Sequence, residues 1–276
     1  MSWADSNEPV IVVHDLVTHY GGRLVLDHVS LEVHRRETLV ILGGSGCGKS
    51  TLLRHLVGLA RPASGSVRLF GQDICRIPET ELNRIRRKIG MSFQGSALLN
   101  SMTVGENVAL PLREHTRLED STIRVMARMK LDQVGLAGVE DYLPAQLSGG
   151  MKKRAGVARA LAMDPEILLF DEPSAGLDPV IAAGIDHLIL KLKAAFGVTI
   201  VVVTHEMASA FLIADRILLL DKGRVIACGT PEEIRASRHP RVRQMLDRQP
   251  DSEAAPGQVY LDSLFGFKVQ SSKSKV

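Results

Sequence analysis

The string GGSGCGKS at residues 43–50 constrains the fold of this chain more than any other feature of its sequence. A short apolar run, Thr38–Leu42, precedes it, and the segment 49–58 that follows has helical character. Glycines at this spacing let successive backbone N–H groups turn inward around a phosphate, and the next helix adds the positive end of its dipole. The strand–loop–helix context therefore predicts a phosphate-binding loop, because a glycine-rich turn that binds nothing rarely carries GxxxxGK[ST].

Two side chains at the end of this loop have specific predicted roles. We expect Lys49 to reach the β- and γ-phosphates of a nucleotide and the Ser50 hydroxyl to ligate Mg²⁺. Two alternatives stay open for Cys47, which is either a thiol of lowered pKa at a helix N-terminus or an inert loop residue. The residues expected to contact the nucleotide here are Gly43, Gly44, Ser45, Gly46, Cys47, Gly48, Lys49, Ser50 and Thr51.

A second feature, a pair of acidic residues, lies far downstream, where the apolar run 167–170 leads into Asp171 and Glu172. A carboxylate that leaves a buried strand beside a phosphate loop suits a Mg²⁺ site, which predicts this role for Asp171. Glu172 would then face the attacking water as general base. Alone, a strand that ends in Asp-Glu is more often a solvated strand end, but its place beyond a helical block gives the pair weight.

The periodicity of apolar residues predicts an α/β chain with a helical insert. Strands are expected at 10–13, 24–33, 38–42, 66–70, 89–93, 166–170, 198–203, 215–220 and 224–228, the first two joined by a Gly21-Gly22 turn. No clear strand lies between about 95 and 165, where Thr103 and Glu106 have the spacing of a capping box. Alternating strands and helices around this block predict a mostly parallel sheet carrying an all-α subdomain. We expect a core from 1–94 and 165–240, a helical subdomain over 95–164 and a C-terminal tail over 241–276.

Composition narrows the setting of the protein. A net charge of only +3 over 276 residues does not favour nucleic acid as a partner. The three cysteines form no CxxC pair, which favours a reducing cytoplasm. The N-terminus lacks the pattern of a signal peptide, and the longest apolar runs are strand-sized, far short of the about 20 residues of a membrane span.

Four further features resemble the ATP-binding-cassette (ABC) ATPases. LSGGM at 147–151 is similar to their signature, SAGLD at 174–178 to their D-loop, Gln94 to their Q-loop glutamine and His205 to their H-loop histidine. The resemblance implies a P-loop NTPase (RecA-like) core with an antiparallel β subdomain and an inserted all-α signature subdomain. It also implies that ATP and Mg²⁺ bind and that ATP is hydrolysed.

The same resemblance assigns further residues. Tyr20 would stack on adenine, Gln94 would contact Mg²⁺ and His205 would contact the γ-phosphate. In this family two copies close head to tail over two ATPs, so the signature of one copy faces the nucleotide of the other. The residues implied at that interface are Ser148, Gly149, Gly150 and Asp178. Met151 replaces the usual glutamine of the signature, which removes one polar contact and leaves the backbone donors intact.

Within the family, the segment 93–116 (FQGSALLNSMTVGENVALPLREHT) and PRVRQML at 240–246 resemble the ATPases that serve MCE-domain lipid transporters, the Mla system among them. This implies integral-membrane permease subunits and an MCE-domain protein as partners, and a peripheral position on the cytoplasmic face of the inner membrane. In this family the stretch 101–112 faces the membrane partner, and we expect Leu98, Leu99 and Met102 to lie nearest to it.

Other functions are weighed against this hypothesis. The cargo of the ATPase is alternatively an amino acid or an ion. A septation regulator or a repair ATPase is a more distant alternative, but 276 residues leave no room for the coiled coils of repair cassettes. A binding module without catalysis would lack Lys49 or Glu172. An apolar cluster within 259–267 either clasps the partner subunit or belongs to a disordered tail.

Overall fold

The computed structural model describes residues 8–249, so the apolar cluster expected within 259–267 lies outside the described residues. The strands are β1 (Pro9–Tyr20), β2 (Arg23–His34), β3 (Thr38–Leu42), β4 (Ser64–Leu69), β5 (Gln72–Asp73), β6 (Ile89–Ser92), β7 (Ile167–Asp171), β8 (Thr199–Thr204), β9 (Arg216–Asp221) and β10 (Arg224–Gly229). The helices are α1 (Lys49–Leu56), α2 (Glu79–Arg86), α3 (Val104–His115), α4 (Asp120–Gln133), α5 (Gly149–Ala160), α6 (Pro179–Phe196), α7 (Met207–Ile213), α8 (Pro231–Ala236) and α9 (Pro240–Leu246), and a short 3₁₀ helix covers Pro144–Gln146.

The larger sheet has six strands in the order β10-β9-β3-β8-β7-β6. All of its neighbouring pairs are parallel except β9 with β10. Every residue of β3 and of β8 is buried, as expected of central strands of a parallel sheet covered on both faces. The predicted mostly parallel sheet is therefore confirmed.

The smaller sheet is antiparallel, with strand order β2-β1-β4-β5. The first strand corrects a prediction: it runs from Pro9 to Tyr20 instead of ending at residue 13. Its second half pairs with β2 through several register shifts, and Asp15 takes a left-handed φ of 51°. Bulges of this kind break the alternation of apolar and polar residues, so the pattern along the chain hides the strand.

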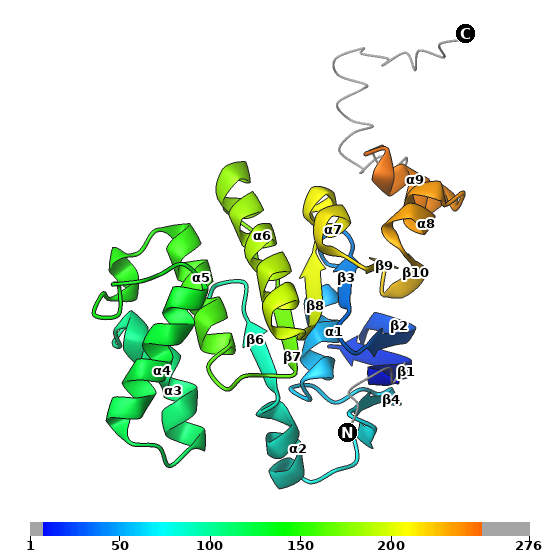
Figure 1. Ribbon diagram of the computed structural model, residues 1–276. Helices are drawn as coiled ribbons and strands as arrows, with labels where there is room; N and C mark the ends of the chain where they lie inside the picture. The colour runs from blue at the N-terminus through cyan, green and yellow to red at the C-terminus, as the bar shows by residue number, and fades with distance from the viewer. Residues whose placement is uncertain (1–7, 250–276) are drawn as a thin grey trace. The chain divides into compact units, whose positions relative to one another are not determined.

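Helix α1 contacts both sheets and joins their cores (Figure 1). Leu52, Leu53 and Leu56 on its buried face belong to one apolar cluster with side chains of both sheets. Burial of each leucine contributes about 1.5–3 kcal/mol to the free energy of unfolding. The helix that follows the glycine-rich loop is thus fixed by the core itself, and the loop is fixed with it.

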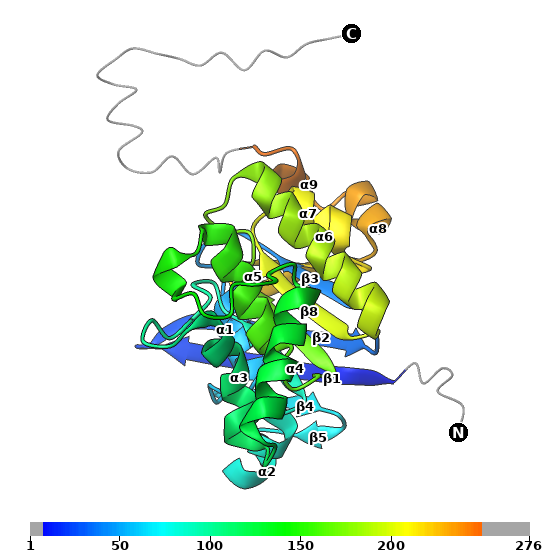
Figure 2. The ribbon, with the colours of Figure 1, turned by 60° about the vertical axis from the view of Figure 1, so that its left-hand side comes forward.

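Helices α3, α4 and α5 pack on one another in a group on one side of the larger sheet (Figures 1 and 2). The predicted capping box is confirmed: the Thr103 hydroxyl accepts from the Glu106 N–H, and the Glu106 carboxylate accepts from the Thr103 N–H. No strand lies between β6 and β7, a stretch that the structure describes throughout. The predicted fold class, a P-loop core with an antiparallel sheet and an inserted all-α segment, is confirmed.

The described chain divides into two compact units, the first ending at Ser237 and the second beginning at Arg238. All ten strands and helices α1–α8 lie in the first unit, and α9 lies in the second. Within residues 8–249, none of the helices has the length and the apolar character that crossing a bilayer requires.

Candidate functional site

Four loops meet at one edge of the larger sheet. They leave the carboxyl ends of β3, β6, β7 and β8, which are parallel, so the residues that follow these strands gather at a single edge. A pocket of about 440 Å³ opens there. The residues that line it are Val25, Ser45, Gly46, Gly48, Lys49, Ser50, Thr51, Gln94, Glu172 and His205. Parts of the sequence predicted independently thus converge on one cavity.

The glycine-rich loop takes a conformation that requires glycine at two positions. Gly46 has a φ of 74° and Gly48 a φ of 107°, in the left-handed region that side chains disfavour. A Cβ atom on Gly48 would also come within 2.7 Å of Leu26 Cδ2. The loop therefore turns sharply into α1, whose first residues, Lys49, Ser50 and Thr51, line the pocket, as expected of an anion site at a helix N-terminus.

Cys47 belongs under the loop and not in the pocket. Its side chain is buried, and burial raises the pKa of the thiol, although the Lys49 ammonium opposes this shift. A Cβ atom on Gly43 would meet Cys47 Sγ at 2.6 Å, so the thiol packs against the loop backbone. The alternative of a thiol with lowered pKa is wrong, since burial outweighs the Lys49 charge and the backbone hydrogen bonds that would lower the pKa.

Lys49 lies back against its own loop and beside a carboxylate. Its ammonium donates to the carbonyl oxygens of Gly43 (2.9 Å) and Gly44 (3.0 Å). The same nitrogen is 3.5 Å from Glu172 Oε1, and both side chains are more than nine-tenths buried. A buried cation next to a row of backbone donors is suited to hold an anion of high charge.

Glu172 is held between a buried cation and a hydrogen-bond donor. On one side stands the Lys49 ammonium; on the other, His205 Nδ1–H donates to Glu172 Oε2 over 2.8 Å. The backbone of Glu172 has a φ of 48°, a strained conformation for a side chain of this size. Such strain persists where the surroundings fix it and is frequent at active sites. The carboxylate is therefore both buried and aimed into the pocket from a fixed position.

The oxygen atoms suited to Mg²⁺ lie close together. The Ser50 hydroxyl donates to Asp171 Oδ1 over 3.0 Å, and Gln94 lines the same pocket as Ser50. Burial raises the pKa of the Asp171 carboxyl, while the bond from Ser50 opposes this shift. Mg²⁺ usually takes one or two protein oxygens and completes its shell with water and phosphate, and this donor set fits that requirement.

The remaining residues of the predicted site are not among those that line the pocket. Tyr20 ends β1 with a side chain that is 48% exposed. Ser148 accepts from the Met151 N–H and caps α5, and Asp178 accepts from two N–H groups and caps α6. A Cβ atom on Gly149 would be 3.4 Å from a Leu177 methyl, and one on Gly150 would be 2.6 Å from an Ile181 methyl. Within one copy, these signature and D-loop residues cap and pack the two helix starts.

Val25, which lines the pocket, and two residues that support the loops around it were not predicted. Lys153 donates to the backbone carbonyl oxygens of Gln94 (2.6 Å) and Glu172 (3.0 Å). Arg159 donates to the carbonyl oxygens of Ser96 and Ala97. The signal in the sequence was the position of Lys153 on the apolar face of its helix, three residues after Gly150 and four before Val157, where a lysine needs a buried partner.

His55 secures α1 to the smaller sheet. It is almost fully buried; Nδ1–H donates to the Ala60 carbonyl (3.0 Å), so Nε2 accepts from the Thr18 hydroxyl (2.8 Å). Burial lowers the pKa of His55 below its ordinary 6.5, although the bond to Ala60 opposes the shift. Two residues beyond Thr18 the strand reaches Tyr20, so this contact also holds the end of β1.

The buried His55 predicts a pH dependence of stability. Its folded pKa lies below its unfolded pKa, so the unfolded chain binds the proton first as pH falls below about 6.5. The free energy of unfolding of the wild type should therefore decline from about pH 7.5 toward about pH 5.5. The decline should be steeper than in His55→Gln, whose residue 55 does not titrate. Chemical denaturation across this range measures both slopes. Equal slopes in the two proteins would contradict the assignment of a neutral buried His55.

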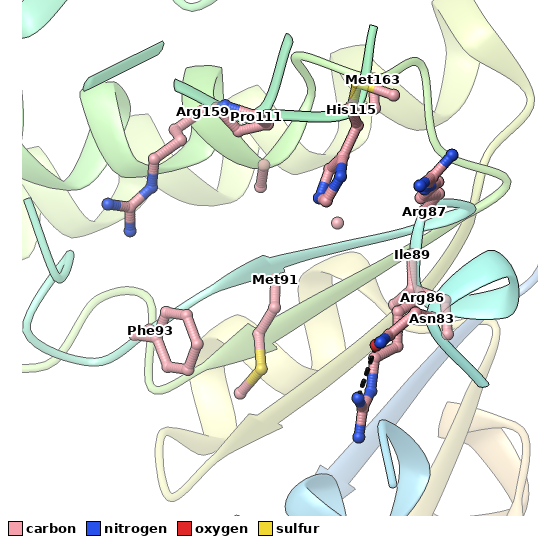
Figure 3. A pocket seen from close by; sticks show the side chains of 12 residues that line it. Asn83, Arg86, Arg87, Ile89, Met91, Phe93, Pro111, His115, Arg159 and Met163 are labelled. Atoms are coloured by element: carbon pink, nitrogen blue, oxygen red, sulfur yellow. Dashed lines mark hydrogen bonds between the residues drawn. The ribbon is translucent and has the colours of Figure 1, made fainter. Parts of the chain in front are cut away.

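A second pocket of about 300 Å³ lies on the outer side of β6 (Figure 3). Apolar side chains of β6 and the following turn, among them Met91 and Phe93, form one wall. Pro111 and His115 of α3 and Arg159 of α5 form the opposite wall, with Arg87 at one end. This pocket, called the groove on β6 below, lies between the sheet and the helical segment. Its lining combines apolar side chains with basic ones.

Comparison with known proteins gives the class to which this fold and site belong. A match to the family described as ABC transporter covers residues 26–175, from β2 to the turn after Glu172. The chain belongs to the ABC transporter family and is an ATPase of the ATP-binding-cassette type.

Individual relatives narrow the comparison. The intermembrane phospholipid transport system ATP-binding protein MlaF of Haemophilus influenzae is 40% identical over 262 residues, which cover 94% of this chain and 99% of that protein. A Mycobacterium leprae protein named "Probable ribonucleotide transport ATP-binding protein mkl" is 42% identical over 237 residues, 86% of this chain and 68% of its own. The ATP-binding cassette MJ0796, solved as a dimer in a post-hydrolysis state with ADP and Pi, matches with a TM-score of 0.74 and 34% identity, covering 80% of this chain and 98% of that one.

Proposed function

We propose that this chain is the ATP-hydrolysing subunit of an MCE-type (Mla-like) ABC transporter that moves phospholipid or a related lipid between membranes. The observation that carries the cargo is the 40% identity to a phospholipid transport ATP-binding protein over nearly the full length of both chains. The alternative of an importer for an amino acid is not favoured by this comparison. The pocket at the edge of the larger sheet supports the chemistry, since it unites a phosphate loop with a buried acid.

In this function the pocket binds ATP and positions water. Lys49 and the loop N–H groups hold the β- and γ-phosphates, while Tyr20 stacks on the adenine. Ser50, Asp171 and Gln94 hold Mg²⁺, which when bound neutralises phosphate charge. Separate groups of residues thus bind the phosphates, the adenine and the metal ion.

The chemical step belongs to two further side chains. The Glu172 carboxylate accepts the proton of the attacking water, and its bond to His205 orients it. The exposed part of His205 then contacts the γ-phosphate. Since phosphoryl transfer depends mainly on positioning and charge, fixed placement of these groups accounts for most of the rate.

The signature residues complete the site of a second copy. Ser148 caps α5, and the first turn of this helix has N–H groups without intrahelical partners, which would meet the γ-phosphate held by a partner subunit. Gly149 and Gly150 begin α5, and Asp178 caps the N-terminus of α6. The dimeric form in which MJ0796 was solved supports a dimer of two such chains, and the head-to-tail arrangement is the one that the family resemblance implies.

The membrane partners lie beyond the groove on β6. Phe93 lines the groove, and the chain continues from it through Gln94 into a loop that exposes Leu99. An exposed apolar loop beside a partly apolar groove suits an integral-membrane permease, and an MCE-domain protein completes the complex. The chain itself then works at the cytoplasmic face of the inner membrane without crossing it.

Leu99→Asp tests this docking surface. The Leu99 side chain is 43% exposed, while its backbone is fixed by Asn107, which bonds both its N–H and its carbonyl. We expect an unchanged melting temperature and at least about tenfold less permease in pull-downs, because a charge would be buried at the contact. Leu118→Asp, on an equally exposed leucine before α4, serves as control. Undiminished recovery of permease with Leu99→Asp would contradict the placement of the docking surface.

The assembly is tested by purifying the native complex through a tag on this chain and identifying its subunits by mass spectrometry. We expect a permease and an MCE-domain protein in constant ratio to the ATPase. Recovery of a permease with a solute-binding protein, and without an MCE-domain protein, would support the other cargo class and contradict the lipid proposal.

A further inference from the structure

One face of α5 holds the loop that follows β6. Lys153, Gly156 and Arg159 lie three residues apart along this helix and face the loop 94–97. A Cβ atom on Gly156 would stand 3.3 Å from Ser96, so helix and loop backbone are in close contact. Ser96 and Ala97 have φ values of 61° and 48°, and the Arg159 guanidinium donates to both of their carbonyl oxygens.

Lys153 differs from Arg159 because it reaches a second segment. Its ammonium bonds the Gln94 carbonyl of this loop and also the Glu172 carbonyl at the end of β7. The side chain is buried, so these bonds are not weakened by water. Burial lowers the pKa of Lys153, while the charges of Glu172 and Asp171 oppose this shift. Without the ammonium, two carbonyl oxygens would face each other with no donor between them.

The backbone of Glu172 needs such support. Its φ of 48° is strained, and within this turn its carbonyl also accepts from the Ala175 N–H over 3.2 Å. A shift of this carbonyl would turn the peptide unit that follows the Glu172 Cα atom. The Cα atom would move with it and displace the carboxylate relative to His205. A displacement of about 1 Å can cost about 10²-fold in rate.

We infer that Lys153 is a positioning residue for Glu172, which ties the backbone of the proposed general base to the loop after Gln94 and to the signature helix α5. The inference rests on the proposed role of Glu172. Because α5 begins at the signature and the loop leads to the groove on β6, movement of either element reaches Glu172 through this one ammonium.

The first test measures ATP hydrolysis and ATP affinity of the purified complex with Lys153→Met, which keeps most of the length of the side chain and removes the donor. We expect about 10²-fold slower hydrolysis, ATP affinity within about threefold of wild type, and recovery of most of the rate in Lys153→Arg. Lys152→Met, the adjacent lysine with the same change of charge, should behave as wild type. Wild-type hydrolysis by Lys153→Met would overturn the inference.

A double variant separates positioning from general damage. If Lys153 acts through the Glu172 carboxylate, then adding Lys153→Met to Glu172→Gln should slow the residual hydrolysis by less than about twofold. A full additional loss would mean that Lys153 acts elsewhere and would contradict the inference. Should Lys153→Met fail to fold, Lys153→Gln, which keeps an amide NH2 group on a shorter, uncharged side chain, is expected to show slower hydrolysis at unchanged ATP affinity; wild-type hydrolysis would overturn the inference equally.

Hydrogen exchange without nucleotide gives a readout that does not depend on hydrolysis. The amide of Ala175 bonds the Glu172 carbonyl, and the amide of Ser96 bonds the Phe93 carbonyl. Both amides should exchange faster in Lys153→Met and unchanged in Lys152→Met; equal exchange in all three proteins would refute the inference. Hydrolysis that does not depend on Glu172 would instead refute the proposed function, whatever the exchange shows.

Discussion

Glu172→Gln is expected to slow ATP hydrolysis by about 10²–10⁴-fold, the usual contribution of a general base. The amide has nearly the shape of the carboxylate but cannot take the proton of the attacking water. Since binding of ATP depends on the loop and Lys49, affinity should persist, and the loss of one negative charge beside Lys49 should favour it. The variant should therefore accumulate as an ATP-bound closed dimer, which size-exclusion chromatography with ATP detects.

Glu166→Gln is the matched control for this result. Glu166 stands just before β7, at the opposite end of the strand from Glu172, and pairs with Arg35 and Lys88 on the surface. Its substitution removes the same charge and should leave turnover unchanged. Undiminished turnover in Glu172→Gln would contradict the assignment of Glu172 as the general base.

Lys49→Ala is expected to weaken nucleotide binding by at least about 30-fold. The buried Lys49 ammonium donates to the Gly43 and Gly44 carbonyl oxygens. When ATP binds, it would donate to the phosphate oxygens instead. Truncating one partner of a buried charge pair costs about 2–5 kcal/mol, or about 30-fold to more than 10³-fold in affinity. Isothermal titration with ATP and Mg²⁺ measures this loss.

The control for Lys49→Ala is Lys191→Ala, on the exposed face of α6. It changes the net charge equally and should bind ATP as wild type does. Thermal unfolding must show that Lys49→Ala is folded, because its removal leaves Glu172 near unpaired carbonyls. Normal ATP affinity in the folded variant would mean that the loop does not hold the phosphates.

The sequence was sufficient to predict much of the fold because the signals were local. The glycine spacing at 43–50 defines a strand, a turn and a helix together, and the buried runs of β3, β7 and β8 are continuous apolar stretches. Parallel pairing then brings the ends of these strands to one edge, so residues separated along the chain meet without any further signal.

Other features depend on contacts that no local pattern encodes. The second half of β1 was missed because bulges shift its register against β2. The helical pattern places Lys153 on an apolar face but does not identify its partners, which are backbone atoms 59 and 19 residues away. Burial of Cys47 decides the pKa of its thiol, and burial follows from packing around the loop and not from the loop sequence. Tertiary surroundings set all three properties.

The central claim, an ATPase that drives lipid movement, is tested most directly by reconstitution of the native complex in proteoliposomes that contain a fluorescent phospholipid. Transfer of the phospholipid between donor and acceptor vesicles, in either direction, is measured with ATP and compared between wild type and Glu172→Gln. We expect transfer that requires ATP and is lost in Glu172→Gln. Hydrolysis that depends on Glu172 while ATP moves no phospholipid would contradict it.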